Sequence, residues 1–281
     1  MTEFLAQLMT WINVPVNFLG KFGLGFIAYL PGWLSNTIIS AVVGVLALFI
    51  LKYTSNQNAI GKAKDITKAN MLALKLFKDS FTVTMKALGQ IYKGAFIRLF
   101  HIIRPVLVMT VPFVLVMSQM GLWYQARPLQ PGEEAVVTMQ LDGDVNSAWP
   151  DVSIVSDPAF DITIDKVRVF SKQQIYWKIK ALEEGIHDLL FEAGPHQVKK
   201  ELVIGDGFMK VSIKRPGRHF EDILLNPWEK PFTQDSPVQS ISIVYPDRLS
   251  KTSGTNWWIG YFFVVSMVSA FILMPFFKVK I

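Results

Sequence analysis

Three long stretches without a charged residue divide this chain. Residues 33–51, 105–124 and 257–277 contain no Asp, Glu, Lys or Arg. Each approaches the ~20 residues that an α-helix needs to cross ~30 Å of hydrocarbon. We therefore predict three transmembrane helices at these positions, called spans 1, 2 and 3. Two tryptophans open span 3 and lysines follow it, a distribution typical of membrane interfaces.

The segment between spans 1 and 2 is strongly basic. Residues 52–104 carry ten Lys and Arg but only two acids, Asp65 and Asp79. A short loop with this excess lies in the cytoplasm under the positive-inside rule. Alternation of the spans then places the N-terminus and residues 125–256 outside the cytoplasm, and the tail, residues 278–281, inside it.

The basic segment is predicted to form a helical hairpin. Apolar residues within 59–99 recur mostly three or four positions apart, which indicates helix with one apolar stripe. A single helix of ~40 residues would be ~60 Å long. A break at Asp79-Ser80 or at Gly89 would instead give two antiparallel arms that bury their stripes against each other.

Residues 125–256 show the two-residue alternation of β-strands. Four groups of apolar residues each share one face of a predicted strand. They are Ala135, Val137, Met139 and Leu141; Ile175, Trp177, Ile179 and Ala181; Met209, Val211 and Ile213; and Ile241, Ile243 and Tyr245. Regularly spaced short strands with an inward Trp177 favour an immunoglobulin-like β-sandwich. The proline-rich residues 219–237 are expected to form an irregular loop.

Residues 1–32 are apolar but interrupted by glycine and proline. Phe4, Leu8 and Trp11 fall on one face of a helix, which favours an amphipathic segment lying in the outer membrane interface. A re-entrant or spanning segment is the alternative. The start of the chain has no basic region and no small-residue cleavage site, so we expect span 1 to be retained.

Composition agrees with a mixture of membrane helices and a water-soluble part. The hydrophobic fraction is 51% and the mean hydropathy is +0.33. Residues 125–256 hold 15 Lys and Arg against 19 Asp and Glu, so the net charge of +6 comes from the inner loop and the two lysines of the tail. The basic residues thus have a sufficient membrane explanation, and no nucleic acid partner is expected.

The sequence carries no recognisable catalytic chemistry. It contains no cysteine, which excludes disulfides, thiolate catalysis and thiolate metal ligands. It has no G-x-S-x-G, phosphate-binding glycine loop or H-E-x-x-H motif. His187 and His196 are read as surface histidines, and a metal site at these two residues is the alternative. We expect no enzyme activity, no cofactor and no metal.

Polar residues within the predicted spans allow two interpretations. Ser40 lies in span 1, Thr110 and Gln119 lie in span 2, and Ser266 lies in span 3. Polar groups in lipid are costly unless they face a partner or water. They therefore either hold the helices together or line a hydrophilic groove open to the cytoplasm.

This layout resembles the YidC-type membrane insertase superfamily, in particular its minimal three-span branch, which includes archaeal homologues and the insertase subunit of the ER membrane complex. The residues that carry the resemblance are span 1, the basic stretch 58–79, span 2 with Arg104-Pro105 at its start, and span 3. The likeness covers under half of the chain.

The resemblance implies a function in inserting membrane proteins. A groove between the spans would lower the cost of passing a polar segment while its apolar neighbour enters lipid. The basic hairpin would receive nascent or client membrane proteins, or the ribosome. The docking residues implied are Lys62, Lys64, Lys68, Lys75 and Lys78, and the groove-lining residues are Ser40, Arg104, Thr110, Gln119 and Ser266.

Two features depart from the family. Many insertases place an arginine inside the first core span, whereas here the nearest arginine, Arg104, precedes span 2. A whole β-domain also separates spans 2 and 3. The alternative function is therefore a non-catalytic anchor whose β-sandwich binds an envelope protein or scaffolds a membrane complex. Either function fits a multi-pass protein of the bacterial inner membrane with a periplasmic domain.

Overall fold

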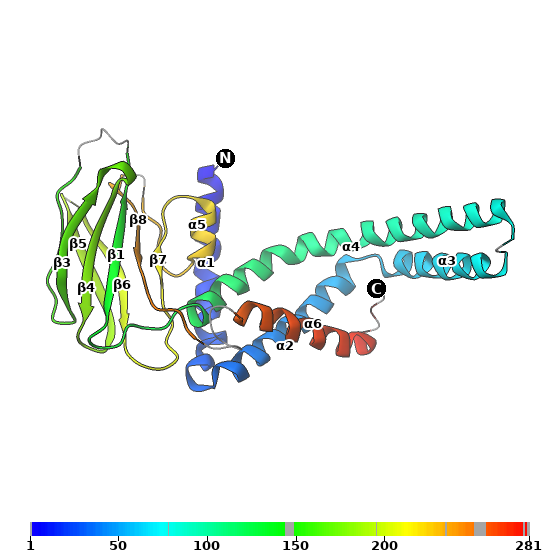
Figure 1. Ribbon diagram of the computed structural model, residues 1–281, viewed down its shortest axis with the longest axis horizontal. Coiled ribbons are helices and arrows are strands. Elements are labelled where there is room, and N and C mark those ends of the chain that lie inside the picture. Colours follow the sequence, from blue (N-terminus) through cyan, green and yellow to red (C-terminus); the bar gives the residue numbers. More distant parts are fainter. Residues whose placement is uncertain are drawn as a thin grey trace. The chain divides into compact units, whose positions relative to one another are not determined.

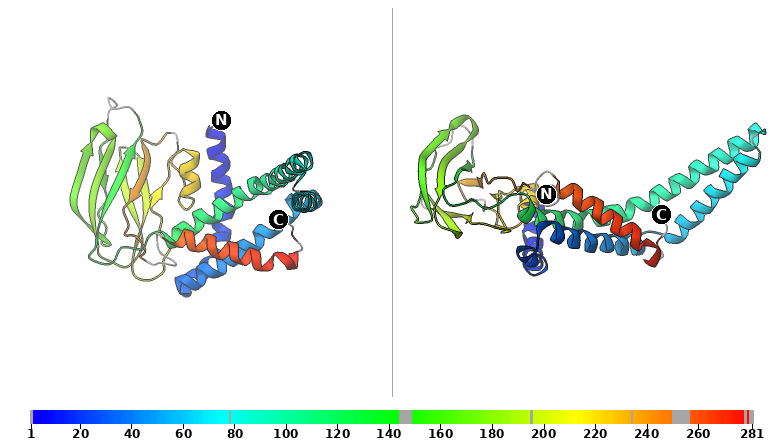
Figure 2. Two further views of the ribbon diagram at one scale, coloured as in Figure 1. Left: turned by 45° about the vertical axis from the view of Figure 1, so that its right-hand side comes forward. Right: turned by 60° about the horizontal axis from the view of Figure 1, so that its bottom comes forward.

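The fold is described from a computed structural model of residues 2–77, 79–143, 149–194, 196–233, 235–249, 257–277 and 279 (Figures 1 and 2). Lys78, one of the predicted docking residues, lies outside the described residues, as does the predicted tail apart from Val279. The chain divides into two units, residues 1–36 with 114–259 and residues 37–113 with 260–281. Each unit is described by itself.

The chain contains six α-helices and eight strands among the described residues. The helices are α1 (Thr2–Gly23), α2 (Gly32–Thr54), α3 (Gln57–Leu76), α4 (Phe81–Tyr124), α5 (Phe220–Leu225) and α6 (Trp258–Phe277), with short 3-10 turns η1 (Gly25–Tyr29) and η2 (Phe170–Lys172). The strands are β1 (Glu134–Leu141), β2 (Val152–Ile154), β3 (Phe160–Val169), β4 (Gln174–Ala181), β5 (Gly185–Ala193), β6 (His196–Ile204), β7 (Lys214–Arg215) and β8 (Val238–Ile243).

Helices α2, α4 and α6 are the three described helices long and apolar enough to cross a membrane. They contain predicted spans 1, 2 and 3, so the prediction of three membrane-length helices is confirmed by length and composition. Large apolar side chains on them face outward, such as Val111, Ile272 and Phe276. In a protein surrounded by water such side chains would be unfavourable, whereas lipid accepts them.

Helix α4 is longer than span 2. It runs without interruption for 44 residues, about 66 Å, and includes Pro105 and Pro112. The predicted boundary between basic segment and span at residues 104 and 105 is therefore not a break in the backbone. The second half of the basic segment and span 2 form one continuous helix.

Helix α3 lies beside the first part of α4 (Figures 1 and 2). Asn56 caps its start, because its side-chain oxygen accepts a hydrogen bond from the Ala59 backbone amide at 3.0 Å. The helix ends at Leu76 and α4 begins at Phe81, so the interruption lies around Asp79 and Ser80, while Gly89 is inside α4.

Small residues allow α3 and α4 to approach closely. A Cβ atom at Gly94 of α4 would lie 3.1 Å from the Ala63 carbonyl oxygen and would also collide with the Thr67 hydroxyl. That hydroxyl is held in place because it donates to the Ala63 carbonyl at 2.8 Å. Gly94 is therefore required by the packing, whereas a Cβ atom at Gly89 meets no atom within 4 Å.

Residues 125–249 form two antiparallel sheets that share one core. The larger sheet has the strand order β3-β4-β1-β8-β7, and the smaller has β2-β5-β6. Trp177 of β4 and Phe191 of β5 meet across the sheets with ring centroids 5.4 Å apart, and both are buried. The predicted inward faces of β1, β4 and β8 are confirmed, since all eleven residues are buried.

Two details of the β-region differ from the prediction. Residues 209–213 are not a strand, although Val211 is buried in the core and Met209 and Ile213 pack against it. Within 219–237, residues Phe220–Leu225 form helix α5 rather than loop. Tertiary packing explains the helix, because Ile223 of α5 is buried against Ala6 and Met9 of α1.

Helix α1 turns most of its large apolar side chains outward. Its packing face combines Ala6, Met9 and Ile12 with two asparagines, Asn13 and Asn17, which donate to the backbone carbonyls of Ile223 and Pro227 at 3.0 and 2.7 Å. On the opposite face Phe4, Trp11 and Phe22 are 69%, 69% and 70% exposed. This orientation is the reverse of that in a water-soluble domain and suits contact with lipid.

Replacing Gly94 with leucine is expected to destabilise the pairing of α3 with α4. Overpacking of this kind costs about 1–3 kcal/mol, and each kcal/mol lowers the melting temperature of a protein of this size by roughly 2–4 °C. Gly89→Leu is the matched control in the same helix and should melt at or above the wild-type temperature. Scanning fluorimetry of the purified protein measures both, and equal melting temperatures would contradict the proposed contact.

Candidate functional site

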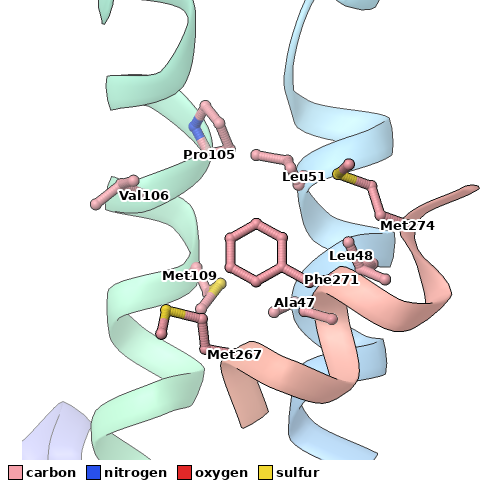
Figure 3. Close-up of a pocket in the computed structure, with 10 residues that line it drawn as sticks. Ala47, Leu48, Leu51, Pro105, Val106, Met109, Met267, Phe271 and Met274 are labelled. Carbon is pink, nitrogen blue, oxygen red and sulfur yellow. The ribbon is translucent and has the colours of Figure 1, made fainter. Parts of the chain in front are cut away.

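An apolar cleft lies between the three membrane-length helices within the second unit. Its volume is about 170 Å³. Helices α2, α4 and α6 each contribute one face to it (Figure 3). The lining residues are Ala47, Leu48, Leu51, Pro105, Val106, Met109, Met267, Ala270, Phe271 and Met274.

The packing of α2 against α6 supports one side of this cleft. A Cβ atom at Gly44 would collide with the Ser266 backbone carbonyl, so the two backbones touch at this point. The hydroxyls of Thr37 and Tyr261 are hydrogen-bonded at 2.7 Å on one side of this contact. On the other side, the rings of Phe49 and Phe277 lie 4.8 Å apart.

The directions of the helices follow from the residues that line the cleft. Residue numbers rise the same way along α2 and α6 and the opposite way along α4 (Figure 3). The ring contacts of Phe113 with Phe262 and Phe263, at 5.7 and 5.3 Å, lie on the same side as the Thr37–Tyr261 pair. This is the arrangement that three alternating membrane crossings require.

The lining of the cleft determines which chemistry it supports. It includes no titratable side chain, so none of its lining residues can act as an acid or a base. Met109, Met267 and Met274 are unbranched and polarisable, and such side chains adapt to apolar partners of different shape. Phe271 projects between them (Figure 3). The cleft is suited to receiving apolar side chains.

The five residues predicted to line a polar groove lie elsewhere. Ser40 is buried on α2, and Arg104 is exposed on α4. The hydroxyls of Thr110 and Ser266 donate to carbonyls of their own helices, Val106 and Phe263, at 2.9 and 3.0 Å. Gln119 donates to the Asn17 side chain at 2.6 Å in the first unit. None of the five lines the apolar cleft.

The four predicted docking residues that the structure describes lie on one helix, α3. Lys62, Lys68 and Lys75 are exposed on α3, and Lys64 is half-buried. The packing face of α3 is formed instead by Ile60, Gly61, Ala63 and Thr67. The lysines therefore lie on surface that the α3–α4 contact leaves available.

In the first unit, the ends of the membrane helices meet the β-region at Tyr124. Its hydroxyl is hydrogen-bonded to that of Ser35 at 2.7 Å. Its ring stacks on Trp258 at 5.9 Å and meets Phe208 edge-on at 5.5 Å. The Val211 amide also donates to the Leu122 carbonyl at 2.8 Å. We call these residues the Tyr124 junction; it joins the start of α2, the end of α4 and the start of α6.

A buried ion pair holds the irregular segment after β6. The Lys200 ammonium is fully buried and donates to Glu229 at 2.6 Å and to the Ser212 carbonyl at 2.7 Å. Glu229 also accepts from the Ser212 hydroxyl and from the Glu201 amide. Because both charges are hydrogen-bonded, this pair has a structural role in fixing residues 212–229.

Lys210 lies over the face of the Trp228 ring, next to the Tyr124 junction. The ring face stabilises the charged ammonium form of Lys210, whereas burial destabilises that form and is the largest influence on its pKa. Burial lowers the pKa of Lys210 to about 7; the Glu201 carboxylate partly opposes this and the Lys21 charge adds to it. Lys210 thus binds its proton less tightly in the folded protein than in the unfolded chain.

Comparison with protein-family models, curated proteins and solved structures gave no match for this chain. Inference about its function therefore rests on its own residues and their geometry.

Sequence reasoning did not identify the residues of the cleft. Met267, Phe271 and Met274 are spaced four and three residues apart, so they share one face of α6. Because every face of a membrane helix is apolar, this spacing does not distinguish the cleft residues from those that face lipid. The junction residues Tyr124 and Trp258 had a clearer signal, as aromatic residues at the ends of apolar stretches.

Replacing Lys210 with methionine is expected to change how stability depends on pH. The unfolded lysine titrates near pH ~10.4, so between pH ~7 and ~10.4 the unfolded state binds a proton that the folded state lacks. The wild type should therefore gain stability relative to Lys210→Met as pH rises from 7 to 9.5. Melting curves at four pH values test this, with the exposed Lys172→Met as control. A difference that is independent of pH would contradict the burial of the charge.

Proposed function

We propose that this protein is a divergent YidC-like membrane-protein insertase or chaperone. The observation that carries the proposal is the methionine-lined cleft among three membrane-length helices. A cleft of about 170 Å³ takes a few side chains rather than a whole helix. The client would thus lay one face of an apolar segment across α2, α4 and α6 while its remaining surface meets lipid.

The cleft supplies the client with apolar contact, and the polar part of the mechanism lies elsewhere. A client segment entering lipid must satisfy its backbone groups by forming helix. Adaptable methionine side chains allow one surface to hold segments of different sequence. The predicted roles of Ser40, Arg104, Thr110, Gln119 and Ser266 in passing a polar flank stay a prediction, since these residues do not share the cleft.

In this proposal α3 and the first half of α4 form a cytoplasmic hairpin that receives the client or the ribosome. Lys62, Lys68 and Lys75 project from the surface that α3 leaves open. Helix α4 runs unbroken from Phe81 through the cleft residue Met109. A displacement of the hairpin when the client or ribosome binds would therefore be transmitted to the cleft through one helix.

The membrane orientation belongs to the same proposal. The N-terminal segment and the β-region face the periplasm of a bacterial inner membrane, and the basic helices face the cytoplasm. The opposite direction of α4 relative to α2 and α6 agrees with three alternating crossings (Figure 3). We further propose that the two β-sheets, with Trp177 between them, form an immunoglobulin-like sandwich.

The second candidate is a non-catalytic anchor that presents the β-region to an envelope partner. The Tyr124 junction favours it, because the Tyr124–Phe208 ring contact and the hydrogen bond from the Val211 amide to the Leu122 carbonyl join the β-region to the last turn of α4 within the first unit. Contacts of this kind suit a scaffold as well as an insertase. The two candidates differ in whether the cleft contacts other membrane proteins.

A photo-crosslinking amino acid at position 267 is expected to capture the apolar segment of a membrane protein during its synthesis. Met267 lines the cleft, whereas Ile272 on the same helix is 64% exposed and does not. A probe at position 272 is therefore the matched control and should react mainly with lipid. Crosslinks of equal yield at both positions, or none at position 267, would count against a client-binding cleft.

Reversing the charge of four α3 lysines is expected to impair insertion. The variant Lys62→Glu, Lys64→Glu, Lys68→Glu, Lys75→Glu places four like charges where the client or ribosome would dock. The same positions changed to arginine form the control, because the charge is kept. In cells depleted of the wild-type protein, the glutamate variant should insert a single-span client about tenfold less efficiently than the wild type. Normal insertion in both variants would favour the anchor.

A further inference from the structure

The outer face of the larger β-sheet contains a polar groove unrelated to the membrane cleft. Its volume is about 490 Å³, within the range of small-molecule sites. Strands β4, β1 and β8 form its floor, and α5 with the residues before it forms one wall. The groove lies entirely within the first unit.

The floor is made of hydroxyl and amide side chains in register. Thr138 of β1 pairs with Ser242 of β8, and Gln140 pairs with Ser240. Gln140 also pairs with Gln174 of β4 on its other side. Directly opposed residues on neighbouring strands have Cβ atoms about 4.5–5.5 Å apart. The side chains thus form a continuous uncharged array across three strands.

Several of these groups have hydrogen-bonding capacity left over. Among the described residues, none forms a hydrogen bond with the hydroxyls of Thr138, Ser240 or Ser242, although each side chain is half-buried. A hydroxyl both donates and accepts, so the three offer six or more bonding positions to a ligand. Sheet residues that merely face solvent are seldom recessed in this way.

The wall is held rigidly and carries little free charge. Lys214 and Asp222 form an ion pair at 2.7 Å, and Asp222 also accepts from the Gly217 amide at 3.3 Å. The opposite side of α5 is packed on α1 through Ile223. His219 lies by Gln239, and Glu221 is exposed at the rim. The groove is therefore preformed, and its floor favours an uncharged ligand.

The hydrogen bonding of the sheet excludes an added peptide strand at this floor. A peptide that extends a sheet pairs with the free backbone groups of an edge strand. Strand β1 at the centre of the floor is paired with both β4 and β8, and β7 pairs with β8 at Ile241 and Ser242, so the middle of the floor offers no free strand edge. A ligand must instead be read by side chains that donate and accept.

A short oligosaccharide meets these requirements. Its hydroxyls donate and accept like those of the floor, and neighbouring strands are about 4.8 Å apart, so the floor is about 10 Å wide. Tyr176 of β4 is paired with Thr138, and its hydroxyl donates a hydrogen bond to the Gln174 side chain. Its ring lies beside the floor, where a sugar ring could stack on it. We propose that the groove formed by β4, β1, β8 and α5 binds an uncharged oligosaccharide of two or three rings.

Calorimetry of the full-length protein in lipid nanodiscs tests this proposal. The probes are chitotriose, cellotriose and maltotriose, each up to 10 mM. We expect at least one to bind with a Kd below 1 mM. Ser242→Phe fills the floor beside Thr138 and should weaken binding more than tenfold. Ser153→Phe is the matched control, because it places the same ring at an exposed position of β2 in the other sheet.

A milder variant keeps the test valid if the phenylalanine disturbs folding. Thr138→Val keeps the shape and removes one hydroxyl, so affinity should fall about three- to tenfold with an unchanged melting temperature. Absence of binding by all three sugars would overturn the proposal. Equal affinity in wild type, Ser242→Phe and Thr138→Val would overturn it as well. Neither result affects the proposed membrane function, which uses other residues.

Discussion

The contact between the backbones of α2 and α6 at Gly44 and Ser266 is the constraint on which the membrane part depends. Between helices in lipid there is no hydrophobic driving force, so close packing of small residues and interhelical hydrogen bonds must hold them together. Gly44 supplies the close packing, and the Thr37–Tyr261 pair supplies a hydrogen bond. With α2 and α6 in contact there, their next turns and α4 enclose the apolar cleft. A side chain at position 44 would therefore alter the cleft without touching it.

The protein presents two recessed surfaces of opposite chemistry. The cleft in the second unit is lined by methionine, phenylalanine and aliphatic groups, whereas the groove on the β-sheet is lined by hydroxyls and amides. Exposing apolar side chains costs free energy in water but not in lipid, whereas a buried hydroxyl without a hydrogen-bond partner is unfavourable. The first surface thus suits apolar protein segments, and the second suits a polyhydroxyl ligand. These assignments do not depend on each other.

Within the first unit, residues at the ends of the membrane-length helices pack against the β-region. The Tyr124 junction gathers residues from the start of α2, the end of α4 and the start of α6. Helix α1 adds a second set of contacts in the same unit, because Asn13 and Asn17 donate to carbonyls of α5 and of the residues after it. The polar groove, whose wall is α5, therefore lies next to a helix with exposed aromatic residues.

The sequence by itself determined the membrane helices and the inward faces of β1, β4 and β8. Charge-free stretches and two-residue alternation are local signals. Each residue of a membrane helix must be compatible with lipid, and every second residue of a strand must be compatible with the core, whatever the rest of the fold. Span 2 was predicted in position but not in extent, since nothing local stops α4 at residue 104. The strand expected at 209–213 is absent, since the Val211 amide donates to the Leu122 carbonyl at the end of α4 and paired strand begins only at Lys214.

Only the tertiary structure decided which residues form the two candidate sites. Every face of α6 is apolar, so the pattern could not single out Met267, Phe271 and Met274 from Ile272 or Phe276. In the same way, Thr138 and Ser242 look like ordinary outward residues of separate strands about a hundred positions apart. Strand register and the placement of α5 bring them into one groove. Periodicity reports the environment that a side chain meets, whereas a site depends on which distant side chains meet each other.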